Sequence, residues 1–175
     1  MLTRRLPLLR PGLVLLALAA CSPGLDWREL RPEGAALRLM FPCKPQAEVR
    51  SQPGPAGQTL AVHAQSCRAQ AWQFTLVWME LGAPAATGPA LQRLGEGPAR
   101  LLRQADEQAL SVAGMTPQAQ ARQRRWVAGA DQPPRSLRQA VFAYGTRVYQ
   151  LQMLGEQDNE AAWAALLGGL RLGPG

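Results

Sequence analysis

The sequence predicts an α+β domain, mainly an antiparallel sheet with helices packed on it. Segments in which apolar and polar residues alternate recur along the chain, as in half-buried strands. Several of these segments are separated by stretches rich in Pro and Gly, which favour turns. Two other segments space their apolar residues as amphipathic helices do.

Residues 1–21 differ from the rest of the chain. Three arginines precede an apolar run, as in export signals. The nine uncharged residues from Gly12 to Ala20 are too few for a permanent transmembrane helix, which needs about 20. The segment ends in LAAC and resembles a bacterial lipoprotein signal peptide with its lipobox. An ordinary cleaved signal followed by a chance Cys21 is the alternative.

The resemblance implies removal of residues 1–20, a diacylglycerol on Cys21, and a short linker over residues 21–34. Several acyl chains give stable membrane attachment where one chain does not. In lipoproteins of this kind an Asp after the cysteine usually means retention in the inner membrane. Because Ser22 stands there, we expect anchoring in the outer membrane, facing the periplasm, rather than in the inner membrane.

The charge of the chain comes almost entirely from arginine. Loss of residues 1–20 would remove three of the 19 basic residues and none of the 12 acidic ones, lowering the formal net charge from +7 to +4. Lys44 is the only lysine. An excess of arginine can meet anionic headgroups or phosphate, whereas the expected compartment argues against nucleic acid as a partner.

The globular part is expected to begin with a strand and a long hairpin. Apolar and polar residues alternate over 37–41, and the pattern stops at Pro42. Two polar alternating segments, 46–52 and 58–65, then flank the sequence PGPAG, which favours a turn.

The remaining two cysteines are predicted to form a disulfide. Opposed residues of a hairpin have a constant sum of numbers, and Cys43 and Cys67 are centred on residue 55 in the turn. The register therefore places the thiols opposite each other, about 4.5 Å apart at Cα in a non-hydrogen-bonded pair, which a disulfide tolerates. An even pair in an oxidising compartment favours the bridge. Two free thiols, or a metal site without its other ligands, are the alternatives.

A strand over 72–79 and a helix come next. Aromatic and apolar residues share one face of WQFTLVWM. The helix is expected from Pro89, with Pro98 kinking or dividing it. Its apolar positions are Leu91, Leu94, Leu101, Leu102 and Ala105.

Three strands and a closing helix are expected in the last part of the chain. The strands cover 120–127, 136–144 and 147–154, and the helix is capped near Asp158. The apolar stripe of this helix comprises Trp163, Leu166, Leu167 and Leu170.

The order of these segments resembles the Mog1/PsbP-like α/β/α sandwich domains of small bacterial envelope proteins. The resemblance rests on MFPCKP, the long hairpin, WQFTLVW, the helix through LQRL and ARLL, the turn AYGTRVYQLQML and the final WAALLGGLRL. It implies a single globular domain over residues 35–172. Members of this family serve unrelated functions, so only the fold carries over.

The candidate binding residues are Arg122, Arg124 and Trp126, which would share one strand face. This group could bind an anion or a partner, although a solvated strand face with a core tryptophan gives the same pattern. The only histidine, His63, is expected to face solvent or to be hydrogen-bonded rather than to act as a general base. No GxSxG motif and no metal-ligand spacing is present. We therefore expect no cofactor and no metal.

These observations predict a lipid-anchored periplasmic domain that binds an envelope protein and catalyses nothing. The alternatives are an envelope hydrolase and a small-ligand carrier with a pocket between helix and sheet. Convergent titratable groups in a cleft would favour the hydrolase, and a cavity of several hundred cubic ångströms would favour the carrier.

Overall fold

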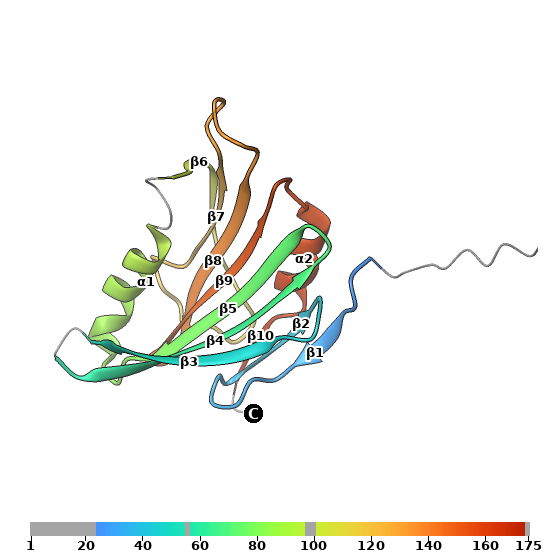
Figure 1. Ribbon diagram of the computed structural model, residues 1–175. Coiled ribbons are helices and arrows are strands. Elements are labelled where there is room, and N and C mark those ends of the chain that lie inside the picture. The colour runs from blue at the N-terminus through green and yellow to red at the C-terminus, as the bar shows by residue number, and fades with distance from the viewer. Residues whose placement is uncertain (1–23, 55–56, 97–100, 174–175) are drawn as a thin grey trace, which may run out of the picture.

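The computed structural model describes residues 24–54, 57–96 and 101–173, which form ten strands and two short α-helices (Figure 1). The helices are α1 (Thr87–Gly95), preceded by the 3-10 turn η1 (Pro84–Ala86), and α2 (Glu160–Gly168). The strands are β1 (Arg28–Leu30), β2 (Leu37–Phe41), β3 (Gln46–Pro53), β4 (Thr59–Ala69), β5 (Trp72–Glu80), β6 (Arg103–Ala109), β7 (Arg122–Val127), β8 (Ser136–Tyr144), β9 (Arg147–Gly155) and β10 (Arg171–Leu172).

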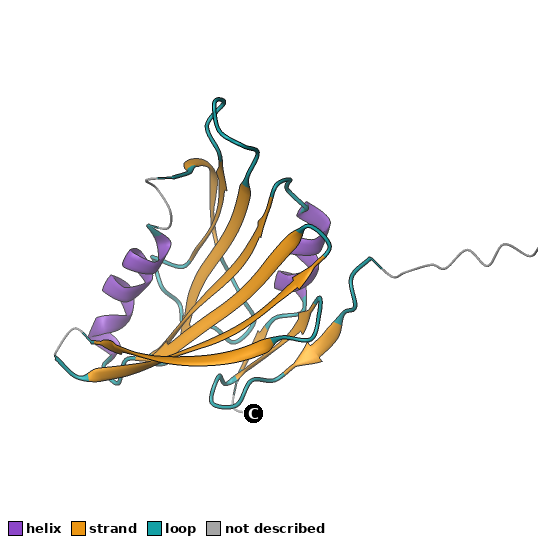
Figure 2. Cartoon of the chain, in the orientation of Figure 1, coloured by secondary structure: helices purple, strands orange, loops and turns teal. Residues whose placement is uncertain are grey.

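Two sheets organise the domain. The large sheet has seven strands in the order β3-β4-β5-β9-β8-β7-β6, and every neighbouring pair is antiparallel. The small sheet has the order β1-β2-β10. Figure 2 shows α1 on one side of the large sheet, and α2 with the small sheet on the other.

The predicted α+β class, with its α/β/α sandwich, is wrong. Strands dominate the described residues, and each α-helix has only nine residues. One face of the large sheet is covered by α2 together with the small sheet, and not by helices alone. The expected helix from Pro89 to Ala105 ends at Gly95, and the polar residues beyond position 102 form the exposed edge strand β6. Glycine and proline at positions 95–98 account for this end, because both disfavour helix.

The main core lies between the large sheet, the small sheet and α2. Alternate residues of β5, β8 and β9 point into it, and Tyr149 donates a hydrogen bond from its hydroxyl to the carbonyl of Ala35, at 2.6 Å. Burial raises the pKa of Tyr149 to about 12. The fully buried side chains in this core include Leu39, Phe41, Phe74, Leu76, Phe142, Leu151, Leu166 and Leu170.

A second, smaller core fixes α1 on the opposite face. Leu91 is fully buried there against Val141, Ala143 and Val148 of β8 and β9. Because α1 is short, this contact determines where the helix lies over the sheet.

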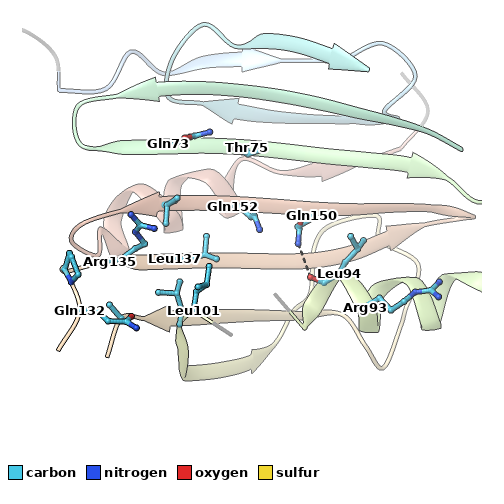
Figure 3. A pocket seen from close by; sticks show the side chains of 14 residues that line it. Gln73, Thr75, Arg93, Leu94, Leu101, Gln132, Arg135, Leu137, Gln150 and Gln152 are labelled. Atoms are coloured by element: carbon cyan, nitrogen blue, oxygen red, sulfur yellow. Dashed lines mark hydrogen bonds between the residues drawn. The ribbon is translucent and has the colours of Figure 1, made fainter. Parts of the chain in front are cut away.

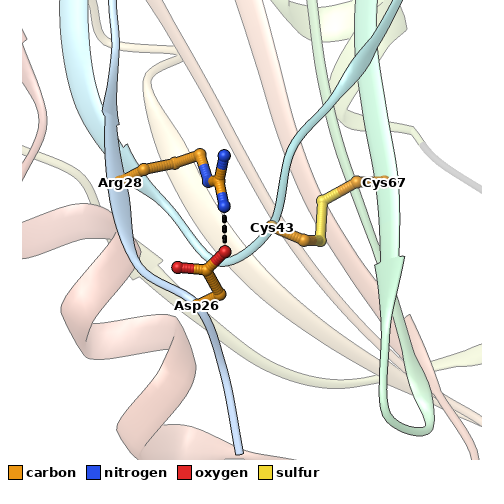
Figure 4. Close-up of a disulfide and its surroundings, with 4 residues drawn as sticks. All are labelled: Asp26, Arg28, Cys43 and Cys67. Atoms are coloured by element: carbon orange, nitrogen blue, oxygen red, sulfur yellow. Dashed lines mark hydrogen bonds and ion pairs between the residues drawn. A yellow bond between two sulfur atoms is a disulfide. The ribbon is translucent and has the colours of Figure 1, made fainter. Parts of the chain in front are cut away.

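The disulfide joins Cys43 to Cys67, with their Cα atoms 6.1 Å apart (Figure 4). The expected register is wrong, however: Gln46 lies opposite Ser66, so Cys43 falls beyond the end of the β3–β4 ladder. Cys43 belongs to the connection between β2 and β3, while Cys67 lies within β4. The bridge therefore ties the segment that leaves the small sheet to β4 of the large sheet, instead of linking two opposed residues of one hairpin.

An ion pair attaches the start of α2 to β8. Arg138 donates from Nε and Nη2 to the two carboxylate oxygens of Asp158, both at 2.6 Å. The helix cap itself is Asn159, one residue beyond the position expected, and its Oδ1 accepts from the amide of Ala162. The hydrogen bonds from Arg138 lower the pKa of Asp158.

Replacing Asp158 with Asn is expected to lower stability at neutral pH, by about 1 kcal/mol or less for so exposed a pair. A carboxyl whose pKa is lowered by folding stabilises the fold above its unfolded pKa, and this contribution is lost as the pH falls through the folded value. The advantage of the wild-type chain over the variant should therefore begin to shrink below about pH 4, the usual pKa of an unfolded Asp, and should be smaller at pH 3 than at pH 7. Urea unfolding at pH 7 and pH 3 measures the difference; a gap of equal size at both values would contradict this assignment.

Candidate ligand groove

A groove of about 760 Å³ lies beside α1, on the face of the large sheet turned away from the main core (Figure 3). Its floor consists of side chains from β5, β9 and β8 that alternate with those of the core. The other walls come from the end of α1, residues 101–102 and the loop before β8. The lining residues from the strands are Gln73, Thr75, Leu137, Gln150, Gln152 and Leu154.

A row of polar side chains runs across this face of the sheet, and two of them, Thr75 and Gln152, line the groove. Thr75 lies opposite Gln152, Gln152 opposite Gln139, and Gln139 opposite Arg124. Adjacent strands place such residues side by side on one face, about 5 Å apart. The floor thus offers amide and hydroxyl groups between apolar positions, instead of a continuous apolar surface.

Two glutamines of the sheet hold the end of α1. Gln139 and Gln150 each donate from Nε2 to the carbonyl of Leu94, at 3.1 and 3.0 Å. A helix ends with carbonyls that have no partner inside the helix, so these bonds satisfy one of them and fix the wall of the groove. Among the described residues, Oε1 of Gln139 has no partner, although that side chain is 1% exposed.

Gly95 allows an arginine to lie against the same helix end. A Cβ at position 95 would stand only 2.3 Å from Nη1 of Arg124. The guanidinium therefore occupies the space that a side chain would fill. A positive charge near a helix C-terminus is favourable, so Arg124 reinforces the attachment of α1.

The predicted group of Arg122, Arg124 and Trp126 does share one strand face, but its members have separate roles. Glu107 on β6 accepts an ion pair from each arginine, at 2.7 Å from Arg124 and 3.5 Å from Arg122. Trp126 is 4% exposed and packs with Leu102 and Leu137, two residues that line the groove. The tryptophan therefore supports a wall of the groove and offers no aromatic surface to a partner.

The groove combines apolar walls with positive charge at its margin. Leu94, Leu101, Leu102, Leu137 and Leu154 provide most of the apolar lining. Arg93 and Arg135 are both exposed and are the only charged side chains among the lining residues that the structure describes. Within residues 24–54, 57–96 and 101–173, no Asp, Glu, His or Cys lines it.

The single histidine does not reach this groove. His63 pairs with Trp78 across β4 and β5, and the two rings stack with their centroids 5.0 Å apart. Trp78 belongs to the main core, on the other face of the sheet. In the described part of the chain, no group of three or more His, Cys, Asp or Glu residues is placed to hold a metal ion.

The predicted lipidation residue, Cys21, lies outside the described residues. Within the described ranges, no helix has the length and apolar character needed to cross a membrane.

No protein-family model matches the chain, and no curated protein matches it. The sequence interpretation did not single out the residues that line the groove. The alternation of Gln150 and Gln152 with Tyr149, Leu151 and Met153 was the available signal, because a second face rich in amides differs from one rich in charges.

Proposed function

We propose that the chain is a lipid-anchored protein of the bacterial cell envelope that binds without catalysing, and that the groove beside α1 takes an amphiphile with an apolar chain and an anionic head. This corresponds to the small-ligand carrier that the sequence offered as an alternative to a protein-binding domain. The observation that carries it is the groove itself, with leucines, neutral amides and two arginines in one lining.

The size and the leucines of the groove suit an apolar chain. Ligand pockets usually measure about 300–1,000 Å³, and the groove lies within this range. Each methylene removed from water contributes about 0.8 kcal/mol, so a chain along Leu154 and Leu137 supplies most of the binding energy. The amides of Gln150 and Gln152 restrict its path along the floor.

The arginines of the groove suit an anionic head. Arg93 and Arg135 have no ion-pair partner among the described residues. A guanidinium binds carboxylate or phosphate through two parallel hydrogen bonds. Acid–base or nucleophilic chemistry would instead need acidic, histidine or thiol groups converging on the ligand, and none of the described lining residues is of these types. The hydrolase alternative therefore has no support in this groove.

A charge reversal in the floor tests the groove. We expect Gln152→Glu to reduce saturable labelling by a diazirine-bearing fatty acid about tenfold, because the new carboxylate is nearly isosteric with the amide but repels an anion and resists desolvation. The yield on the full protein in neutral detergent is measured by mass spectrometry. Gln46→Glu, on the exposed strand β3, is the matched control and should label as the wild type does. Equal labelling of both variants would contradict the proposal.

Acyl labelling tests the anchor separately. Growth with a labelled fatty acid should modify the wild-type chain covalently, and Cys21→Ala should abolish this modification because the acceptor thiol is lost. The mature N-terminus should begin at residue 21. Unchanged labelling of the variant, or recovery of the native chain with residues 1–20 and no acyl group, would refute the lipoprotein proposal.

A protein partner is the second candidate. Leu101 is 69% exposed at the rim of the groove, and β3 and β6 are exposed edges of the large sheet. An exposed leucine and unpaired strand edges are features that partner segments use. Photo-labelling that fails while an envelope protein cross-links through residue 101 would favour this candidate over the amphiphile.

A further inference from the structure

A second cavity, of about 740 Å³, lies at the end of the small sheet, between the β1–β2 connection and the C-terminal strand. It is separate from the groove, because Arg147 and the small sheet lie on the other side of the large sheet. Of the eleven described residues that line it, four are arginines and one, Glu33, is acidic. The arginines are Arg31, Arg38, Arg147 and Arg171.

Two of these arginines face each other directly. Arg38 of β2 and Arg171 of β10 are register partners in an antiparallel pair. Like charges in such positions destabilise a sheet. In the described part of the chain neither has an acidic partner, and Arg171 bonds only to the carbonyls of Gly168 and Leu170, at 2.8 and 2.7 Å. The small sheet thus holds two positive charges together that it does not neutralise.

The other two arginines each make one ion pair with a glutamate. Arg147 is 23% exposed and bonds Glu80 at 3.1 Å, and Arg31 bonds Glu29 at 2.6 Å. A guanidinium has five N–H donors, so a single ion pair leaves donors free for a ligand. The guanidinium groups of Arg31 and Arg147 therefore keep N–H donors available for a ligand in the cavity.

We propose that this cavity binds the oxygens of a phosphate group. A phosphate group would relieve the repulsion between Arg38 and Arg171 and accept paired hydrogen bonds from their planar guanidinium groups. Lysine, a compact charge without this fork, is absent from the lining. The ligand is a phosphate group, whether free in solution or carried by a lipid headgroup.

Arg31, which lines the cavity, is close in sequence to the predicted lipidation site, so both free phosphate and lipid headgroups can reach the cavity. Arg31 follows Cys21 by ten residues, which span at most about 35 Å when fully extended. If Cys21 is lipidated, as the proposed function holds, the arginines lie within reach of headgroups. The phosphate site itself rests on the four arginines and not on the anchor.

Titration calorimetry on the full protein in neutral detergent tests the site. One arm uses inorganic phosphate, and the other uses glycerophosphoglycerol, the water-soluble headgroup of phosphatidylglycerol. We expect saturable binding in at least one arm, weakened about tenfold or more by Arg38→Gln, because hydrogen bonds between charged groups are strong. Arg38→Lys should restore only part of the affinity. Arg68 is exposed on β4, so Arg68→Gln removes the same charge elsewhere and should change affinity less than twofold.

The two arms distinguish the sources, and the variants test the site. Tighter binding of glycerophosphoglycerol, a phosphodiester, assigns the cavity to lipid headgroups. Tighter binding of inorganic phosphate assigns it to the free ion. Arg38→Gln should not lower the melting temperature in the absence of ligand, because it removes a repulsion. Absence of saturable binding in both arms, or equal weakening by Arg38→Gln and Arg68→Gln, would overturn the proposal. If Gln152→Glu does not reduce fatty-acid labelling, the proposal for the groove fails, but the phosphate proposal for this cavity still stands.

Discussion

Replacing Leu91 with alanine is expected to lower the free energy of unfolding by about 3 kcal/mol, the middle of the range for a buried leucine. Leu91 is fully buried in the apolar cluster that joins α1 to Val141, Ala143 and Val148 of the sheet. The remaining attachment is polar: the bonds from Gln139 and Gln150 to the carbonyl of Leu94, and the contact of Arg124 with Gly95.

The same substitution should also loosen one wall of the groove. Hydrogen exchange should therefore rise in α1 more than in β8 and β9, and denaturant unfolding gives the total loss. Leu101→Ala provides the control, because this side chain is 69% exposed and its truncation should cost less than about 0.5 kcal/mol. A loss equal to that of Leu101→Ala would show that Leu91 does not fix the helix.

Removal of the disulfide is expected to have an effect of similar size. Replacing Cys43 and Cys67 with alanine should cost about 3 kcal/mol in the chain-entropy model, for a sequence separation of 24 residues. For a domain of this size the melting temperature should fall by about 10 °C. The loss of local stability should be greatest around the β2–β3 connection and β4, because the bridge joins these two segments.

Reduction provides the matched control for this variant. Wild-type protein melted in excess dithiothreitol should approach the melting temperature of the double variant, because both lack the same cross-link. The double variant should be insensitive to the reductant. Equal melting temperatures for the oxidised, reduced and substituted proteins would mean that the bridge contributes nothing to stability.

Local sequence patterns were sufficient for the strands of the core and for the last helix. The alternation over 37–41, 72–79, 136–144 and 147–154 corresponds to β2, β5, β8 and β9. These segments are long or strongly patterned, and each buries one face against the main core. The stripe containing Trp163 and Leu166 likewise became the buried side of α2.

The errors occurred where non-local pairing decides the structure. Residues 101–109 combine two leucines and an alanine at helical spacing, yet pairing with β7 makes residues 103–109 a strand. The short strands β1 and β10 exist because β2 lies between them. The hairpin is centred one residue later than expected, since Pro53 lies opposite Thr59, which moved Cys43 out of the ladder without preventing the disulfide.

The groove could not be derived from the sequence because its floor depends on the order of the strands. Thr75, Gln152 and Gln139 are far apart in the chain and become neighbours only because β9 lies between β5 and β8. The same applies to the arginine cavity, where Arg38 meets Arg171 through the pairing of β2 with β10. Sequence composition indicated an excess of arginine but not where it gathers.

The most direct test of the proposed binding function is the residue-level map of photo-labelling on the wild-type protein. A diazirine-bearing fatty acid should insert into residues of β5 and β9 that line the groove, and into Leu101 or Leu102, with competition by the unlabelled fatty acid. Insertion confined to other surfaces, or labelling that unlabelled fatty acid does not reduce, would contradict the account.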